Sequence, residues 1–219
     1  ATLGYLPEGG NSAGASLAGM LPHRGVGGRS LSPGLNVADM LAARLKAYVL
    51  LGAIEPAHDI AAPAALDALK AAECVIALTP YSTAKEFAHV ILPIGSFAET
   101  SGTYVNLEGR WQSAPGAASP VGESRPAWKV LRVLGNLLNL PGFEQTSSDQ
   151  VTEEVRKALA DQPEFSVKSS ARTLQSKLAL TPGQAERDVA LYQVDPIVRR
   201  SSALQATREA LEAAKGRRT

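Results

Sequence analysis

The sequence predicts an α/β fold in which a parallel sheet is flanked by helices. Apolar runs at 47–51, 74–78 and 89–93 carry this prediction. A strand that is apolar along its whole length is buried on both faces, as the strands of a parallel sheet are. Helical segments separate the runs at the spacing of βαβ crossovers, which lay helices against the sheet. We therefore expect a doubly wound α/β domain over 1–145 and a helical or extended C-terminal tail over 146–219.

The elements expected in this domain follow a glycine-rich opening, residues 1–36, which favours loops with tight turns. Asn36 suits the N-cap of a helix. Pro63 suits the first turn of another. The predicted elements are, in order, a helix at 11–20, a helix at 37–45, a strand at 47–51, a helix at 63–73, a strand at 74–78, a helix at 82–88 and a strand at 89–93.

After the third strand the pattern changes. An extended segment is expected at 104–112, and an amphipathic helix at 126–140 ends at a Pro-Gly pair. In that helix Trp128 is assigned to the core, with Lys129 and Arg132 on the opposite side. The tail is expected to contain helices at 148–160 and 202–215, joined by a partly extended segment.

Composition excludes several classes of function. A net charge of +1 and an aromatic content of 5% argue against nucleic acid as a partner. The one cysteine, Cys74, cannot by itself hold an iron–sulfur cluster or form an internal disulfide, and we interpret it as a packing residue. The three histidines lack the spacing of metal ligands. Because no apolar run reaches about 20 residues, we expect no direct membrane insertion. The loop-like opening predicts that the chain begins inside a longer protein.

The most specific pattern lies between residues 89 and 112. It reads HVILP, then ETSGTYVN, then EGRWQ. This order and spacing resemble the molybdopterin oxidoreductase family, which carries a strand ending in Leu-Pro, an acidic residue before Gly-Thr, and then N-x-E-x-R-x-Q. The resemblance implies that family's nucleotide-binding-like α/β domain. The matching loop residues are Glu99, Gly102, Thr103, Asn106, Glu108, Gly109 and Arg110.

Further residues point to one branch of that family. Trp111, AWKVLR at 127–132, and DPIVRR at 195–200 with LQAT at 204–207 look like the large peripheral-arm iron–sulfur protein of bacterial respiratory NADH:quinone oxidoreductase (complex I). This resemblance implies a peripheral position on the cytoplasmic side of the inner membrane, with the other subunits of the complex as partners. It also implies iron–sulfur clusters in an N-terminal region that this chain omits.

One departure bears on the cofactor. Active members typically carry a G-x-N-P turn after the strand matching 47–51, whereas this chain has GAIEP at 52–56. A carboxylate at Glu55 would repel the phosphates of a pterin cofactor. We therefore expect a cofactor-free structural domain. The alternative is a cofactor-binding fragment of a true molybdopterin enzyme, such as a formate dehydrogenase. An unrelated nucleotide-binding enzyme would need a glycine-rich turn directly after its first strand, which the sequence lacks.

No residue is assigned to catalysis. Glu99 and Glu108 could act as an acid–base pair, but we favour structural roles: Glu99 accepting backbone hydrogen bonds, and Glu108 pairing with Arg110 or Arg125. The candidate subunit contacts are Trp111, Arg199 and Arg200. Trp111 could equally fill the core, and the two arginines could equally be a solvated pair.

Overall fold

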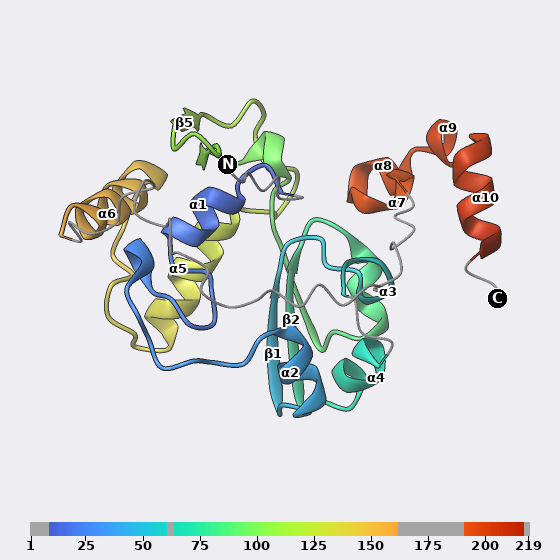
Figure 1. Ribbon diagram of the computed structural model, residues 1–219, viewed down its shortest axis with the longest axis horizontal. Helices are drawn as coiled ribbons and strands as arrows, with labels where there is room; N and C mark the ends of the chain where they lie inside the picture. The colour runs from blue at the N-terminus through green and yellow to red at the C-terminus, as the bar shows by residue number, and fades with distance from the viewer. Residues whose placement is uncertain (1–8, 61–63, 162–190, 217–219) are drawn as a thin grey trace, which may run out of the picture.

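The computed structural model describes residues 9–60, 64–161 and 191–216. Figure 1 shows three groups of elements within this part of the chain. A parallel sheet with its helices lies in the centre. A hairpin and the helices α1, α5 and α6 lie to the left of the sheet, and the C-terminal helices lie to its right. None of the described helices is long and apolar enough to cross a membrane.

The central sheet confirms the predicted α/β class. Its strands β1 (Ala47–Leu51), β2 (Cys74–Thr79) and β3 (Val90–Pro93) run parallel in the order β1-β2-β3. In this register Val49 lies beside Ile76, and Ile76 beside Val90. The three strands coincide closely with the three apolar runs.

Helices cover one face of this sheet. They are α2 (Val37–Ala42), α4 (Ala65–Lys70) and the 3₁₀ turn η2 (Ser82–Glu86), while the short α3 (Pro56–Asp59) follows β1. Asn36 caps α2 by accepting the Asp39 N–H at 3.0 Å, as its sequence position predicts. The buried cluster on this face contains Leu41, Tyr48, Ala65, Ala68, Leu69, Ala72, Val75, Ala77, Ala84 and Phe87.

The opposite face differs from the doubly wound expectation. Side chains alternate along a strand, so Val49, Leu51 and Val90 point away from the cluster around Tyr48 and Val75. All three of these apolar side chains are exposed. Within the described residues, the expected helical cover is therefore incomplete on this side.

The segment expected to be extended at 104–112 belongs to a hairpin. Strands β4 (Gly102–Val105) and β5 (Trp111–Ala114) pair antiparallel, after the 3₁₀ turn η3 (Phe97–Glu99). Asn106 shapes the turn by accepting the N–H groups of Glu108 and Arg110 at 3.0 and 2.9 Å. Gly109 has φ +78°, a value that favours glycine.

The hairpin packs against one helix that precedes it in the sequence and one that follows it. These are α1 (Ser12–Leu17), near the 3₁₀ turn η1 (Val26–Gly28), and α6 (Ser148–Ala160). Asn11 accepts the Val105 N–H at 2.8 Å, and the Thr103 hydroxyl lies 3.1 Å from that of Thr152. The amphipathic helix α5 (Ala127–Leu137) lies beside them. Trp128, expected in the core, is only partly buried.

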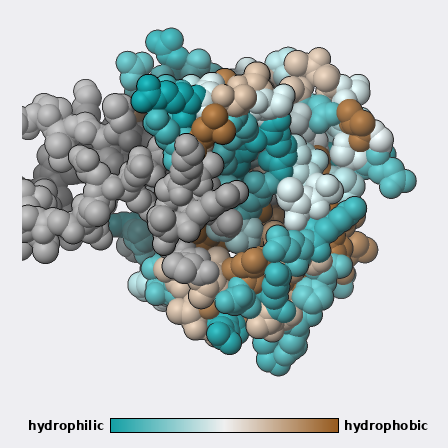
Figure 2. All heavy atoms as spheres, turned by 90° about the vertical axis from the view of Figure 1, so that its right-hand side faces the viewer, coloured by the Kyte–Doolittle hydropathy of each residue, from teal (hydrophilic) through white to brown (hydrophobic). Residues whose placement is uncertain are grey.

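The C-terminal part consists of four short helices, α7 (Leu191–Val194), α8 (Pro196–Arg200), α9 (Ser202–Gln205) and α10 (Arg208–Gly216). The helix predicted at 202–215 is thus broken in two. Thr207 explains the break, because its hydroxyl donates to the Leu204 carbonyl and accepts the Ala210 N–H, beginning a new helix. Figure 2 faces this side of the molecule, where hydrophilic side chains dominate the surface that is not drawn grey. The partly extended segment predicted before 202 lies largely outside the described residues.

Candidate functional site

The carboxyl ends of β1 and β2 form the edge where parallel sheets bind their ligands. Strand β1 leads into Gly52, whose φ of +100° turns the chain into α3. This turn places Glu55 and Asp59 at the sheet edge, and Asp59 closes it by accepting the Glu55 N–H at 2.7 Å. Strand β2 leads to Tyr81 and Thr83 at the same edge. The edge therefore presents two carboxylates, a hydroxyl and an aromatic ring.

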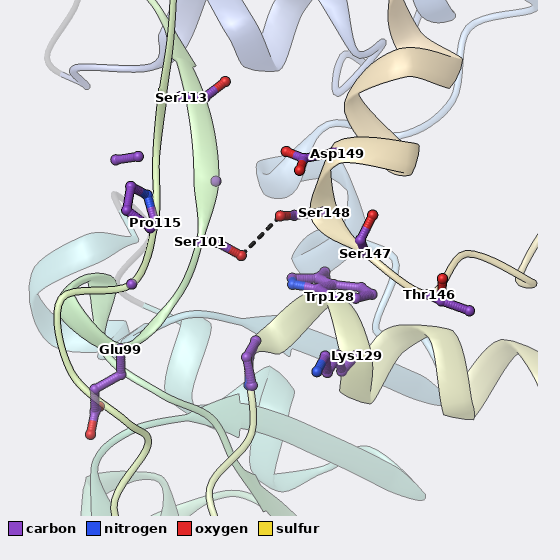
Figure 3. A pocket seen from close by; sticks show the side chains of 14 residues that line it. Glu99, Ser101, Ser113, Pro115, Trp128, Lys129, Thr146, Ser147, Ser148 and Asp149 are labelled. Carbon is purple, nitrogen blue, oxygen red and sulfur yellow. Dashed lines mark hydrogen bonds between the residues drawn. The ribbon is translucent and has the colours of Figure 1, made fainter.

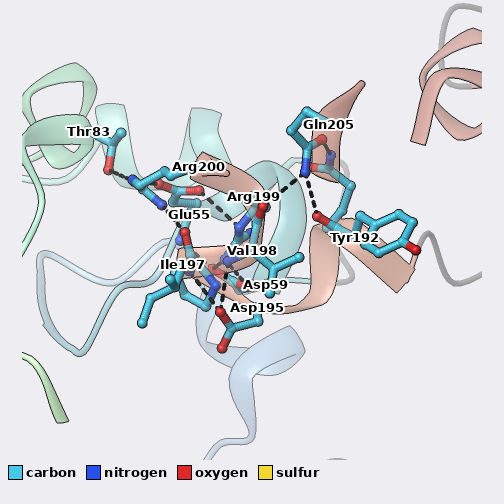
Figure 4. Close-up of polar contacts among 12 residues, drawn as sticks. Glu55, Asp59, Thr83, Tyr192, Asp195, Ile197, Val198, Arg199, Arg200 and Gln205 are labelled. Carbon is cyan, nitrogen blue, oxygen red and sulfur yellow. Dashed lines mark hydrogen bonds and ion pairs between the residues drawn. The ribbon is translucent and has the colours of Figure 1, made fainter. Parts of the chain in front are cut away.

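Helix α8 brings two arginines to this edge from the far end of the chain (Figure 4). The helix begins at Pro196, and Asp195 caps it by accepting the N–H groups of Ile197 and Val198 at 2.8 and 3.0 Å. A Pro in the first turn and an Asp at the N-cap are the strongest local signals for starting a helix. They fix where Arg199 and Arg200 emerge.

Arg199 is nearly buried, with its side chain 4% exposed, and lies between the two carboxylates. Its Nη2 donates to both oxygens of Asp59, at 3.0 and 3.2 Å. Its Nε lies 3.4 Å from Oε2 of Glu55. A guanidinium is the cation best suited to such a place, because its planar fork matches carboxylate geometry and stays charged.

Arg200 completes the cluster from the more exposed side. Its Nη2 donates to Oε1 of Glu55 and lies 3.5 Å from the Thr83 hydroxyl. Its guanidinium carbon lies 3.7 Å from the centre of the Tyr81 ring, a cation–π contact. We call Glu55, Asp59, Arg199 and Arg200 the arginine latch, since it joins the tail to the sheet.

The arginine latch is electrically balanced, with two positive and two negative groups. Burial alone would raise the pKa of Glu55. Hydrogen bonds from Arg200 and Thr83, together with the charges of Arg200 and Arg199, outweigh burial and hold that pKa below its ordinary value. Glu55 is therefore an ionised, fully engaged carboxylate and a poor proton acceptor.

This arrangement does not fit an anionic pterin cofactor. Phosphate groups at the sheet edge would meet the ionised Glu55 and Asp59, and the two guanidinium groups able to bind phosphate already hold those carboxylates. The helix that carries the arginines also lies against the edge itself. No group of three or more metal-binding side chains occurs among the described residues.

The motif residues lie elsewhere, in the hairpin and the loop before it. Glu99 accepts the N–H groups of Ser96 and Val121 at 2.7 and 3.0 Å, the structural role expected for it. Hydrogen bonding to Ser96 lowers the pKa of Glu99. Gly102 and Thr103 belong to β4, and Arg110 is exposed just before β5. These positions shape the hairpin and do not converge on the sheet edge.

The ion pair expected for Glu108 does not form within the described residues. Glu108 and Arg110 are both exposed at the hairpin turn. Arg125 donates instead to the carbonyls of Gly122 and Ser124, at 3.4 and 2.7 Å. Backbone carbonyls close in sequence satisfy that guanidinium at a smaller entropic cost than a distant carboxylate would.

The candidate contact residues have varied surroundings. Trp111 is partly buried, and the Arg156 guanidinium lies 5.0 Å from its ring centre. For Arg199 and Arg200 the sequence offers a subunit contact or a solvated pair, whereas the structure shows both in ion pairs within the chain. Sequence reasoning missed this pairing. One weak indication was present in the sequence. Neither Glu55 nor Asp59 has a lysine or arginine close to it in sequence, so a cation to pair with them had to come from a distant segment.

A hollow between the hairpin and the two helices beside it is a second candidate for ligand binding. It encloses about 580 Å³. Hydroxyl groups line much of it, and those of Ser101 and Ser148 are 2.8 Å apart (Figure 3). Trp128 and Lys129 from α5 form its lower side. Its lining offers several hydroxyl groups, with the carboxylates of Glu99 and Asp149 and the Lys129 ammonium beside them.

Several curated relatives are named as subunits of NADH-quinone or NADH-ubiquinone oxidoreductase. The chain is 35% identical over 136 residues to the G subunit of NADH-quinone oxidoreductase from Rickettsia conorii, covering 58% of this chain and 19% of that protein. It is 51% identical over 53 residues to the mitochondrial NADH-ubiquinone oxidoreductase 78 kDa subunit of Candida albicans, covering 24% and 7%. The chain thus spans at most about a fifth of the length of these relatives.

A relative of another kind is the nitrate reductase of Synechocystis sp., 41% identical over 68 residues, covering 31% of this chain and 9% of that protein. The model of the molybdopterin oxidoreductase family matches residues 3–137. Because this match extends over more than half of the sequence, the chain belongs to the molybdopterin oxidoreductase family.

Proposed function

We propose that this chain is a cofactor-free structural domain of the large peripheral-arm iron–sulfur protein (the G subunit) of NADH:quinone oxidoreductase. In this proposal it supports electron transfer from NADH to quinone, coupled to proton translocation, without carrying electrons itself. The iron–sulfur clusters would lie in another region of the same polypeptide. The domain would sit peripherally on the cytoplasmic side of the membrane, against other subunits of the complex.

The observation that carries the proposal is the arginine latch. Arg199 is nearly buried between Glu55 and Asp59 at the edge where a family cofactor would be expected. A site that retained its cofactor would keep its cations free for phosphate, whereas here the chain's own carboxylates use them. Similarity to the Rickettsia and Candida subunits supports the placement within NADH:quinone oxidoreductase.

The direct test is elemental and optical analysis of the purified chain, expressed in a host that makes molybdopterin. We expect no stoichiometric molybdenum and no pterin fluorescence after denaturation. As a control, a molybdopterin enzyme purified from the same cells should contain both. Molybdenum near one atom per chain would overturn the proposal.

The second candidate is a cofactor-binding fragment of a true molybdopterin enzyme, which the similarity to the Synechocystis nitrate reductase favours. It requires α8 to leave the sheet edge. An Arg199→Glu, Arg200→Glu double variant would repel Glu55 and Asp59 and open that edge. If the open variant gained pterin while the native chain had none, the fold would retain a latent cofactor site.

A further inference from the structure

A cavity of about 500 Å³ lies beside the first half of α5, distinct from the sheet edge. Its wall contains three cationic side chains, Arg125, Lys129 and Arg132, and no carboxylate. None of the three makes an ion pair in the part of the chain that the structure describes. The cavity is therefore strongly electropositive, in a molecule whose net charge is only +1.

Helix α5 and the segment after it hold these groups in place. Trp128 and Arg132 are one helical turn apart, on neighbouring positions of one face of the helix, and not on opposite sides as the sequence predicted. Gly135 lets the chain return closely, because a Cβ there would be 2.3 Å from Cδ1 of Phe143. The returning segment brings Gln145 and Thr146 to the opposite wall.

Hydrogen bonds make that opposite wall rigid. The side-chain amide of Gln145 donates to Glu154 at 2.7 Å and to the Gly142 carbonyl at 3.0 Å. The N–H and hydroxyl of Thr146 both donate to the Gln150 side chain, at 2.7 and 3.2 Å. The cavity therefore has a preformed shape, as small-molecule sites usually do.

Two buried donors in the wall have no acceptor among the described residues. They are Nε1 of Trp128 and Nε of Arg132. Buried donors are nearly always satisfied in proteins. Because neither nitrogen is accessible, each would reach an anion in the cavity only after a small shift of its side chain. Arg199 also has two nitrogens without a hydrogen bond, Nε and Nη1, but its guanidinium is paired with the carboxylates of Glu55 and Asp59. Within the described chain, Arg132 makes no such ion pair.

We propose that the α5 cavity binds an oxyanion, the carboxylate or phosphate group of a small ligand. Arg132 would supply a forked guanidinium, Lys129 a mobile point charge, and a small shift of Trp128 its indole N–H. Arg125 adds positive charge at the rim, while its hydrogen bonds to Gly122 and Ser124 keep it in place.

The neighbouring hollow shows where the rest of such a ligand would lie. Trp128, Lys129 and Thr146 line both cavities, so the two adjoin. The hollow contains Glu99 and Asp149, which disfavour an anion there, together with several hydroxyl groups. Glu99 is held by Ser96 and Val121 and points away from Trp128 in Figure 3. The oxyanion thus belongs on the α5 side, with a neutral polar portion toward the hydroxyls.

The test is calorimetric titration of the full chain with inorganic phosphate and, separately, with acetate, at constant ionic strength. We expect saturable binding of at least one anion, weakened about tenfold or more in Arg132→Gln. Lys129→Gln, at an exposed position, should weaken it several-fold without disturbing the fold. Arg110→Gln is the matched control, because that arginine is exposed on the hairpin and does not line the cavity.

The two anions distinguish the sources of the charge. Phosphate binding would indicate a phosphorylated ligand, and binding of acetate alone would indicate a carboxylate. The proposal is overturned if neither anion binds, or if Arg110→Gln weakens binding as much as the two cavity variants do.

Discussion

Helices α8 and α5 both carry arginines in partly buried positions, but they satisfy them differently. On α8, Arg199 meets two carboxylates supplied by the loop after β1. On α5, Arg132 has a buried Nε without an acceptor and no ion pair within the described chain. An arginine therefore joins two segments of the chain through ion pairs at α8, whereas at α5 an arginine is available to a ligand. What decides its role is whether the fold brings a carboxylate to it.

The largest expected effect separates the two regions directly. Arg199→Met leaves Asp59 without its cation and Glu55 paired with Arg200 alone, and should cost up to about 3–5 kcal/mol of tail docking. Arg132→Met removes a buried donor that lacks a partner, so it should change stability by less than about 1 kcal/mol. Urea unfolding and hydrogen exchange over residues 196–205 would measure both. Equal losses in the two variants would contradict the comparison.

Acid should release the tail and leave α5 unaffected. The pKa of Glu55 is lowered below its ordinary value of 4.5 in the folded protein. The stabilisation by this carboxylate is therefore present above that value and is lost as the pH falls through the lowered pKa. The protection of the α8 and α9 amides, corrected for the intrinsic pH dependence of exchange, should fall in that window. Glu55→Gln should weaken docking at neutral pH and reduce its acid dependence. Protection of the tail that does not change with pH in the native chain would argue against the latch.

The smallest effect concerns the shape of the second latch arginine. Arg200→Lys keeps the charge but loses the stacking on Tyr81 and the guanidinium geometry that lets one side chain reach both Glu55 and the Pro196 carbonyl, at a cost of about 1 kcal/mol. The cost is small because the Arg200 side chain is 31% exposed and water screens its ion pair. Tyr81→Leu should cost a similar amount in the same exchange assay. A cost as large as that of Arg199→Met would mean that Arg200 carries the docking.

How much the sequence could predict depends on the range of each interaction. Strands β1 and β2 followed from uninterrupted apolar runs, and the start of α2 from Asn36, because these signals are local. The break before α10 was missed, since the Thr207 hydroxyl competes with a helical pattern that would otherwise continue. Glu55 was singled out correctly as unusual, but its partners could not be found, because nothing local links residue 55 to residue 199.

The residues of the family motif were easy to recognise in the sequence, but their role could not be predicted from it. In the structure they form turns: Asn106 accepts backbone hydrogen bonds in the hairpin turn, and Glu99 accepts them in the loop before the hairpin. A sequence motif shared by a family can therefore specify a turn of the backbone and no catalytic or binding function. The cavity beside α5 gave no such signal, because Arg132 and Gln145 come together only through the close packing of Phe143 on Gly135.

The latch also bears on the order in which the molecule assembles. The pair Arg199–Asp59 joins residues 140 positions apart in sequence. During synthesis the tail emerges after the sheet and its β1 loop, which have had time to form. The entropy of closing a loop grows only slowly with length, so doubling the segment between α6 and α7 would change the cost by about 0.6 kcal/mol. Tail docking should therefore tolerate insertions between α6 and α7, and it can occur only after the sheet edge has folded.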